Sequence, residues 1–272
     1  MTPDIIFLIA ALIGAGLFAG LVAGLFGVGG GVVIVPAVYY AQAALGYPEE
    51  TRMHVAVATS LATIIATSIR SVMAHNKKGA VDWNVLRAWS PWIVLGALAG
   101  AFVADMTPGL ALTAFFGAVA MLIAAQMFFG RPGWRLADEL PGGLPRAGMG
   151  AGMGLASAMM GIGGGTFGVL LMTLCGRSIH KAVGTAAGFG VAIGAPAALG
   201  FVIAGWGVAN VPPGSLGYVS APGFFFIATL TVLMAPVGAA LAHRLDGNLL
   251  RRLFAIGLTV TACSLLYEAL AG

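Results

Sequence analysis

The sequence predicts an all-α integral membrane protein made of two inverted-topology repeats, each with five hydrophobic segments. Two observations point to the membrane: 60% of the 272 residues are hydrophobic, and only 8% are charged. An ordinary soluble domain is about half apolar and about a quarter charged, so this chain cannot cover a folded core with a water-soluble surface. A third observation, an internal sequence repeat, divides the chain into two halves.

Ten apolar runs, separated by Gly, Pro or charged residues, define the predicted helices. Most of them reach the roughly 20 residues that cross about 30 Å of hydrocarbon. The second, sixth and seventh runs are shorter, which gives each half a short, glycine-interrupted pair that fits a re-entrant hairpin. The runs lie at 5–26, 32–45, 54–74, 85–104, 110–129, 146–160, 166–175, 179–204, 221–242 and 249–268.

The remaining composition excludes several other classes of protein. The net charge of +4 comes without the clustered Lys and Arg of a nucleic-acid surface. Cys175 and Cys263 lie among apolar residues, which is typical of small buried hydrophobes rather than of a disulfide or metal site. The first 20 residues have no positive charge ahead of their apolar core and include Asp4. We therefore interpret them as a first membrane segment and not as a cleaved signal peptide.

The repeat is visible in three ordered matches between the halves. The first match has a G-x-G-G-G run in each half, and the second has a His and a Thr in each half. Chance matching of Gly and Ala is the alternative, but the shared order favours a duplication, which is common in membrane transport folds. We predict a first repeat at 1–129, a linker at 130–146 and a second repeat at 147–272. Residues 20–31 align with 154–165, 54–60 with 180–186, and 100–104 with 238–242.

The distribution of charge decides between an inverted and a parallel repeat. With five segments in each half, 12 of the 13 Lys and Arg residues fall on one side of the membrane, and only Arg52 falls on the other. If each glycine-interrupted pair were one broken helix, the same charges would divide 7 and 6. The positive-inside rule favours the first division. We therefore predict inverted repeats, a cytoplasmic linker and both termini on the periplasmic side.

The glycine runs of the short pairs are the predicted substrate site. Glycine tolerates positive φ and has no side chain, so each run allows a tight turn at which a ligand contacts bare amides. The returning helix begins at this turn, and its first N–H groups and its dipole bind an anion without a formal positive charge. Close helix packing is the alternative role for these glycines. The candidate substrate-binding residues of the turns are Gly27, Gly29, Gly30, Gly31, Gly161, Gly163, Gly164, Gly165 and Thr166.

Hydroxyl and imidazole groups stand at matching places in the two halves. Thr59, Ser60 and Thr185 follow the turns and either donate to the anion or bond to a carbonyl four residues earlier. His54 and His180 precede them and are caps or gate elements, unless they are only interfacial residues. The carboxylates all lie in loops or at segment ends, which suits an anionic substrate and argues against a carboxylate proton relay.

The predicted segments contain no His-rich cluster, no paired carboxylates and no Ser-His-Asp set. Because a membrane enzyme needs convergent catalytic groups, we predict neither an enzyme nor a cofactor or metal site. The predicted partners are a small anion and membrane lipid, without nucleic acid, and the sequence leaves a homo-oligomer open. A secondary anion transporter is the leading interpretation. A passive anion channel of the same fold is the alternative, because a broken-helix site serves both.

Three motifs resemble those of the TauE/SafE family of sulfite exporters: Gly27-Val-Gly-Gly-Gly31 followed by Pro36, Gly161-Ile-Gly-Gly-Gly165, and His180-Lys-Ala-Val-Gly-Thr185. The resemblance extends over nearly the whole chain. It implies export of sulfite, or of an organosulfonate such as sulfoacetate, across the bacterial inner membrane. Leu170 stands where the first half has Pro36, so the two turns need not contribute equally to the site.

Overall fold

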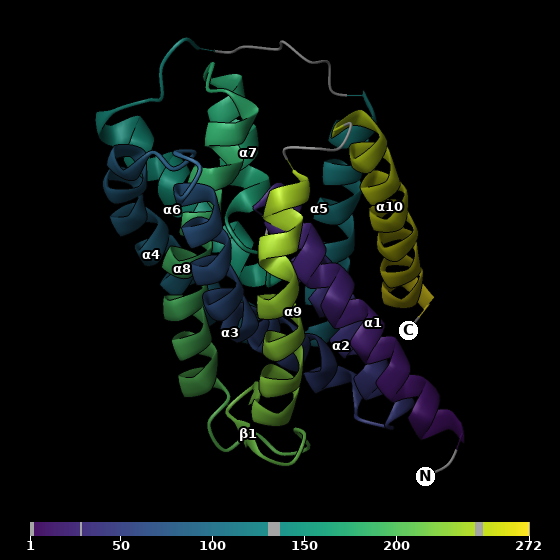
Figure 1. The fold of residues 1–272 in the computed structure, drawn as a ribbon. Helices are drawn as coiled ribbons and strands as arrows, with labels where there is room; N and C mark the ends of the chain where they lie inside the picture. The colour runs from purple at the N-terminus through teal and green to yellow at the C-terminus, as the bar shows by residue number, and fades with distance from the viewer. Residues whose placement is uncertain (1–2, 28, 130–136, 243–246, 272) are drawn as a thin grey trace.

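The computed structural model describes residues 3–27, 29–129, 137–242 and 247–271, which fold into an all-α bundle (Figure 1). Among the described residues, five helices are long and apolar enough to cross a membrane, namely α3, α4, α5, α8 and α9, which confirms the predicted all-α membrane protein. The described helices are α1 (Pro3–Phe26), α2 (Gly31–Ala44), α3 (Glu49–Asn76), α4 (Trp83–Asp105), α5 (Gly109–Phe129), α6 (Gly143–Met160), α7 (Gly165–Leu174), α8 (Ile179–Ala204), α9 (Ala221–Leu241) and α10 (Gly247–Ala271). Two short antiparallel strands, β1 (Ser215–Leu216) and β2 (Val219–Ser220), precede α9.

All ten predicted segments are helices, and the start of α3 is the end that differs most from its prediction. It begins at Glu49, five residues before the predicted 54. Pro48 is the extended N-cap residue, and Glu49 and Glu50 occupy the first turn, where the helix dipole favours negative charge. Hydropathy missed this turn because it is polar. The two strands were not predicted either, because two residues are too few to show an alternating pattern.

The loops define two opposite faces of the bundle. The described linker residues 137–142 lie on one of them, called the linker face below, and β1 and β2 lie on the other, called the β-strand face (Figure 1). α2 contacts α1 and lies toward the β-strand face, whereas α7 contacts α6 and lies toward the linker face. With 14 and 10 residues, or about 21 and 15 Å, neither short helix crosses the bundle.

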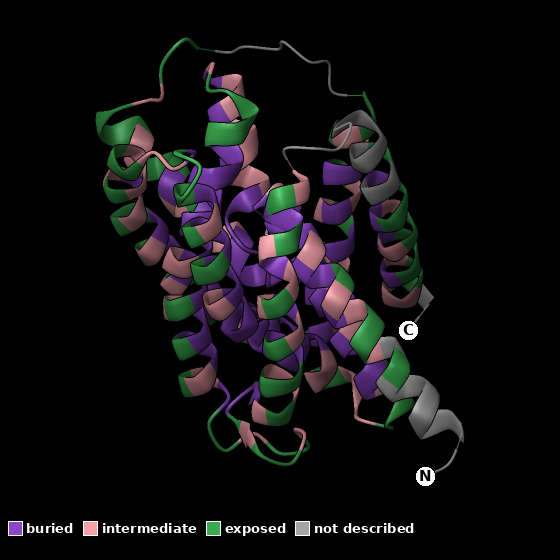
Figure 2. Cartoon of the chain, viewed as in Figure 1, coloured by how far each residue is buried: buried purple, intermediate pink, exposed green. Residues whose placement is uncertain are grey.

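α3 and α8 form the centre of the bundle. They pack against each other, and the surrounding helices pack against one or both of them, except α10, which packs on α5. Buried residues gather toward this centre, and exposed residues lie on the outer faces (Figure 2). The exposed side chains include large apolar ones such as Leu122, Phe225 and Val260, as expected where hydrocarbon rather than water surrounds the protein.

Glycines bring α1 against α9, and α4 against α6, at backbone distance. A Cβ added at any of four of them would overlap the backbone of the opposite helix. The contacts in one pair of helices recur in the other pair at the positions that the sequence repeat aligns. The four contacts are Gly20 with Thr231, Gly154 with Ile93, Gly238 with Leu21, and Gly100 with Leu155.

The two cysteines are free thiols in different environments. Cys175 is buried, as predicted. The prediction of burial was wrong for Cys263, which is exposed on α10. This helix packs mainly on α5, so much of its surface faces outward.

Candidate functional site

The first turn, which joins α1 to α2, depends on glycine for its backbone conformation. Gly27, Gly29 and Gly30 have φ angles of 67°, 76° and 82°, a left-handed region that costs other residues roughly 1–2 kcal/mol each. Gly30 is also the N-cap residue of α2. The returning helix therefore starts at Gly31, which is buried inside the bundle.

The second turn, which joins α6 to α7, depends on glycine partly for another reason. Gly161 ends α6 with a φ of 64°, but Gly164 has a φ of −61° that any residue can adopt. Space is what requires glycine at 164, because a Cβ there would overlap the Cβ of Phe189 on α8. The two turns thus share a sequence pattern and a left-handed first glycine, Gly27 or Gly161, but differ in backbone conformation at the aligned Gly30 and Gly164.

The two turns contact each other at the centre of the bundle. A Cβ added to Gly31 would overlap the carbonyl oxygen of Gly161 and lie 2.8 Å from the Cα of Ile162. A Cβ on Gly29 would lie 3.5 Å from the Cα of Gly163. The structure therefore brings the predicted glycines of both halves together, although the contacting pairs are 130 and 134 positions apart in the sequence. Their contact is packed, so a ligand reaches these amides only when the turns separate.

Ser60, a predicted hydroxyl, lies at this contact. Its Oγ donates a hydrogen bond of 2.7 Å to the carbonyl oxygen of Gly161, and its side chain is fully buried. This bond fastens α3 of the first half to the turn of the second half. Opening the contact between the turns must therefore move or break it.

Two helices begin at the contact and direct their N-termini toward it. The first N–H groups of α2, from Gly31, and of α7, from Gly165, have no partner within their own helix. Their dipoles add partial positive charge at the same place. Thr166, the second residue of α7, is half-buried. Every described carboxylate side chain lies at a helix end or in a loop, so the contact is electrostatically suited to an anion.

Thr59 and Thr185 occupy equivalent positions with the same hydrogen bond. Thr59 Oγ1 accepts from the N–H of Ser220 at 3.0 Å, and Thr185 Oγ1 accepts from the N–H of Asp82 at 2.8 Å. Ser220 and Asp82 are the N-cap residues of α9 and α4. Neither of the two predicted roles includes this one. Each hydroxyl keeps its own proton, since accepting a bond does not use it.

The two matched histidines lie in different surroundings. His54 is 5% exposed, and its Nδ1 lies 3.1 Å from the Glu50 carbonyl while its Nε2 lies 3.1 Å from the carbonyls of Ala104 and Thr107. His180 is exposed at the start of α8. An interfacial position fits His180 but not His54. The His54 ring instead joins the start of α3 to the end of α4 and the loop after it.

Tyr218, in the turn between β1 and β2, covers His54 on the β-strand face. The two rings stack with centroids 5.1 Å apart. Burial, together with the neighbouring Asp105 carboxylate, raises the pKa of the Tyr218 phenol to about 12. Tyr218 is therefore neutral at physiological pH and adds no charge to this end of the bundle.

Ser157 is a hydroxyl near the second turn that the sequence analysis did not select. It lies one helical turn before Gly161, is fully buried, and its Oγ has no hydrogen-bond partner among the described groups. The aligned position in the first half is Ala23. A search for hydroxyls before the glycine runs, and not only after them, would have found it.

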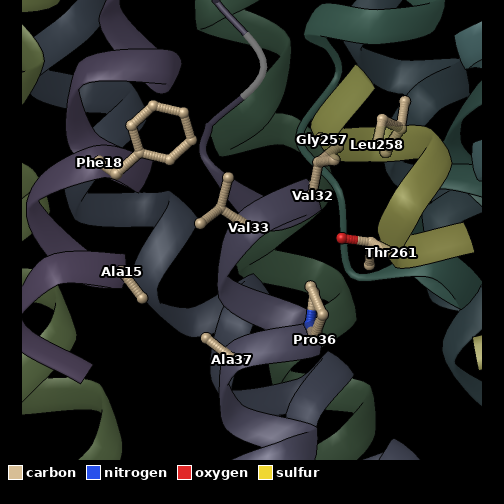
Figure 3. A pocket seen from close by; sticks show the side chains of 9 residues that line it. All are labelled: Ala15, Phe18, Val32, Val33, Pro36, Ala37, Gly257, Leu258 and Thr261. Atoms are coloured by element: carbon tan, nitrogen blue, oxygen red, sulfur yellow. The ribbon is translucent and has the colours of Figure 1, made fainter. Parts of the chain in front are cut away.

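A separate apolar pocket of about 190 Å³ lies between α1, α2 and α10 (Figure 3). Phe18 of α1, Val33 and Pro36 of α2 and Leu258 of α10 line it, and Thr261 supplies the hydroxyl seen in the figure. The residues that line it are apolar apart from Thr261 and include none of the glycines of the two turns, so the pocket offers an anion few hydrogen-bond donors. The contact between the glycine turns is the better candidate site.

The bundle, with its long apolar helices and two interrupted helix pairs, is that of a polytopic membrane protein. The family model for the sulfite exporter TauE/SafE matches residues 12–265, and the chain belongs to this family. A probable membrane transporter protein of Haemophilus influenzae is 32% identical over 259 residues, which cover 95% of this chain and 97% of that protein. The probable membrane transporter protein MJ0441 of Methanocaldococcus jannaschii is 25% identical over 186 residues, which cover 68% of this chain and 69% of that protein. No solved structure matches the chain.

Proposed function

We propose that this protein is a secondary transporter that exports a small sulfur-containing anion, sulfite or an organosulfonate such as sulfoacetate. The observation that carries the proposal is the meeting of two glycine turns at which α2 and α7 both begin. Helix N-termini with bare glycine amides can replace part of an oxyanion's hydration shell. The name of the matching family model supports sulfite as the first substrate to test.

Transport by alternating access requires the two turns to part. Gly31 and Gly161 are in backbone contact in this structure, which leaves no room for an ion between them. Separation on one face exposes the amides to that side, and separation on the other face exposes them to the opposite side. An open passive channel would instead need a continuous pore through this contact.

We also propose that the two halves are inverted repeats, 1–129 and 147–272, joined by a linker at 130–146. The glycine contacts support this, because α1 meets α9 through the same aligned positions by which α6 meets α4. The N-cap bonds of Thr59 and Thr185 support it equally. When two inverted halves exchange conformations, the transporter passes between two equivalent states that open to opposite sides of the membrane.

The linker face is assigned to the cytoplasm in this proposal, and the termini to the periplasm. The described Lys and Arg side chains near helix ends on this face are Arg70, Lys77, Lys78, Arg87, Arg146, Arg177, Lys181 and Arg252. Arg52 lies near the opposite face, at the start of α3. Arg131, Arg135 and Arg244, which also entered the predicted division, lie outside the described residues, and so does the side chain of Arg251. Labelling of terminal tags from each side of the membrane tests the assignment, and a cytoplasmic terminus would contradict it.

Purified protein in lipid vesicles tests the substrate. We expect uptake of sulfite that saturates with concentration and competes with sulfoacetate more than with sulfate or thiosulfate. Saturation together with accumulation against a gradient distinguishes a transporter from a channel. If none of the four anions moves, the substrate assignment is wrong.

Substitutions in the turns test the site. Gly30→Val and Gly164→Val should both abolish sulfite transport while the protein still inserts in the membrane. Gly152→Val is the matched control, because Gly152 lies in α6 with no atom within 4 Å of an added Cβ. Normal transport by both turn variants would exclude the turns as the site.

A further inference from the structure

Two buried serines on α3 have no role in the fold that accounts for them. Ser68 and Ser71 are each 1% exposed, and neither Oγ has a hydrogen-bond partner among the described groups. A buried hydroxyl without a partner costs roughly 1–3 kcal/mol. Such groups in a native structure call for an explanation, and a transient ligand is one.

Both serines lie on the face of α3 that begins at the contact between the glycine turns. At about 100° per residue, Ser71 is about 20° and Ser68 about 80° around the helix from Ser60, which bonds to Gly161. At about 1.5 Å per residue, Ser68 lies about 12 Å and Ser71 about 17 Å beyond Ser60 along the helix axis. Both lie toward the linker face, where α3 ends. The Ser68 Oγ points at α8, where a Cβ on Gly190 would overlap it.

Other polar groups extend the same face of α3 toward the linker face. Thr67 lies between the serines and Ser60, and its Oγ1 is 2.8 Å from that of Thr231 on α9. His75, on the last turn of α3, lies with its Nε2 3.0 Å from the carbonyl of Gly24 on α1. The face is therefore bordered by α1, α8 and α9 and carries hydroxyl or imidazole groups from Ser60 to His75, interrupted by the buried Ile64.

The aligned face of α8 is apolar. The repeat matches Thr67, Ser68, Ser71 and His75 of α3 with Ile193, Gly194, Ala197 and Phe201 of α8, and these four are also buried. Packing at the centre of the bundle can thus be achieved without hydroxyls. Because α8 runs from the linker face to the β-strand face, its apolar stretch lies in the half of the bundle opposite to the serines.

We infer that the hydroxyls of Ser68 and Ser71 form an oxyanion-binding position on the linker-face half of the transport route. The inference rests on the proposed function and adds to it a second position, between the glycine turns and the linker face. Two hydroxyl donors spaced by one helical turn replace water around the anion as it approaches the turns. The aligned apolar face of α8 provides no such position. The route therefore has these hydroxyl groups on the linker-face side of the turns, and the aligned apolar face on the β-strand-face side.

Sulfite transport into inverted membrane vesicles is the first test. The double variant Ser68→Ala/Ser71→Ala should raise the half-saturating sulfite concentration at least tenfold, because the loss of one hydrogen bond to a charged group already has about this effect. Thr63→Val is the matched control. It also removes a buried α3 hydroxyl, but one that already donates to the Thr59 carbonyl at 2.9 Å. An unchanged half-saturating concentration in the double variant, or an equal change in the control, would overturn the inference.

Thiol labelling without sulfite keeps this test separate from the substrate assignment. In a protein with Cys175 and Cys263 replaced by alanine, Ser71→Cys and Ala197→Cys place a thiol at aligned positions. An anionic, membrane-impermeant methanethiosulfonate should modify Cys at 71 from the linker face at least tenfold faster than Cys at 197. Equal rates, or modification of position 71 only from the β-strand face, would reject the proposed oxyanion-binding position on the linker-face half of the route. If wild-type protein moves no sulfite while the Ser71→Cys and Ala197→Cys variants show the expected labelling, only the substrate assignment is rejected.

Discussion

The two glycine turns have nearly the same sequence and meet at one place, yet they depend on glycine in different ways. In the first turn three glycines adopt a left-handed backbone conformation. In the second, Gly164 has an ordinary helical conformation and is limited by the neighbouring Phe189. The repeated motif therefore lets the backbones of the two turns come into contact, but the physical requirement for glycine at each position differs with its surroundings. Substitutions that separate conformational from steric effects can test this difference.

The largest expected effect is at the point where the turns touch. Gly31→Ala should destabilise the protein by about 3 kcal/mol and reduce transport to background, because its Cβ overlaps the backbone at Gly161 and Ile162. Backbone cannot rotate away as a flexible side chain can. Thermal unfolding in detergent and vesicle transport measure the two effects. Gly152→Ala, in open space on α6, should change stability by less than about 1 kcal/mol.

The next effect distinguishes the two turns by rescue. Gly29→Ala places a Cβ 2.9 Å from the Cγ2 of Ile64, so Ile64→Ala removes the overlap and leaves only the cost of positive φ. The double variant should be more stable than the sum of the single changes by about 1 kcal/mol. Gly164→Ala should not be rescued by Phe189→Ala, because alanine retains the Cβ that collides. Rescue in both turns, or in neither, would remove the distinction.

A hydrogen-bond effect of similar size tests the likeness between the halves. Thr59→Val and Thr185→Val each leave a backbone N–H of an N-cap residue without its acceptor, at a cost of about 1–3 kcal/mol each. Thr→Ser at either position retains the acceptor and should cost less. Melting temperatures of the four variants provide the comparison. A loss at only one of the two positions would show that the equivalent bonds differ in strength.

The smallest effect concerns the matched histidines. His54→Gln disturbs contacts of a buried ring with three carbonyls and should lower stability by about 1 kcal/mol. His180→Gln alters an exposed side chain and should change stability by less than about 0.5 kcal/mol. The same melting measurement serves both. A larger loss at His180 than at His54 would reverse the proposed comparison.

Much of the fold was predictable because membrane helices are specified locally. Hydropathy alone located ten helices, and the polar first turn of α3 at Glu49 and Glu50 shows its limit. The glycine runs indicated both turns because positive φ is a local property. Ser68 and Ser71 were not singled out, since their burial without a partner depends on α8 and other helices that pack around them.

The sequence by itself determined that this protein lies in a membrane, where its helices fall and where two of them are interrupted. These properties depend on composition and on neighbours along the chain. Only the tertiary structure decided that Gly31 touches Gly161, that Thr59 and Thr185 hold the N-caps of α9 and α4, and that one face of α3 is polar within the core. Each of these contacts joins residues about 100 or more positions apart. No local pattern encodes which of many similar Gly, Ser and Thr residues packing will bring together.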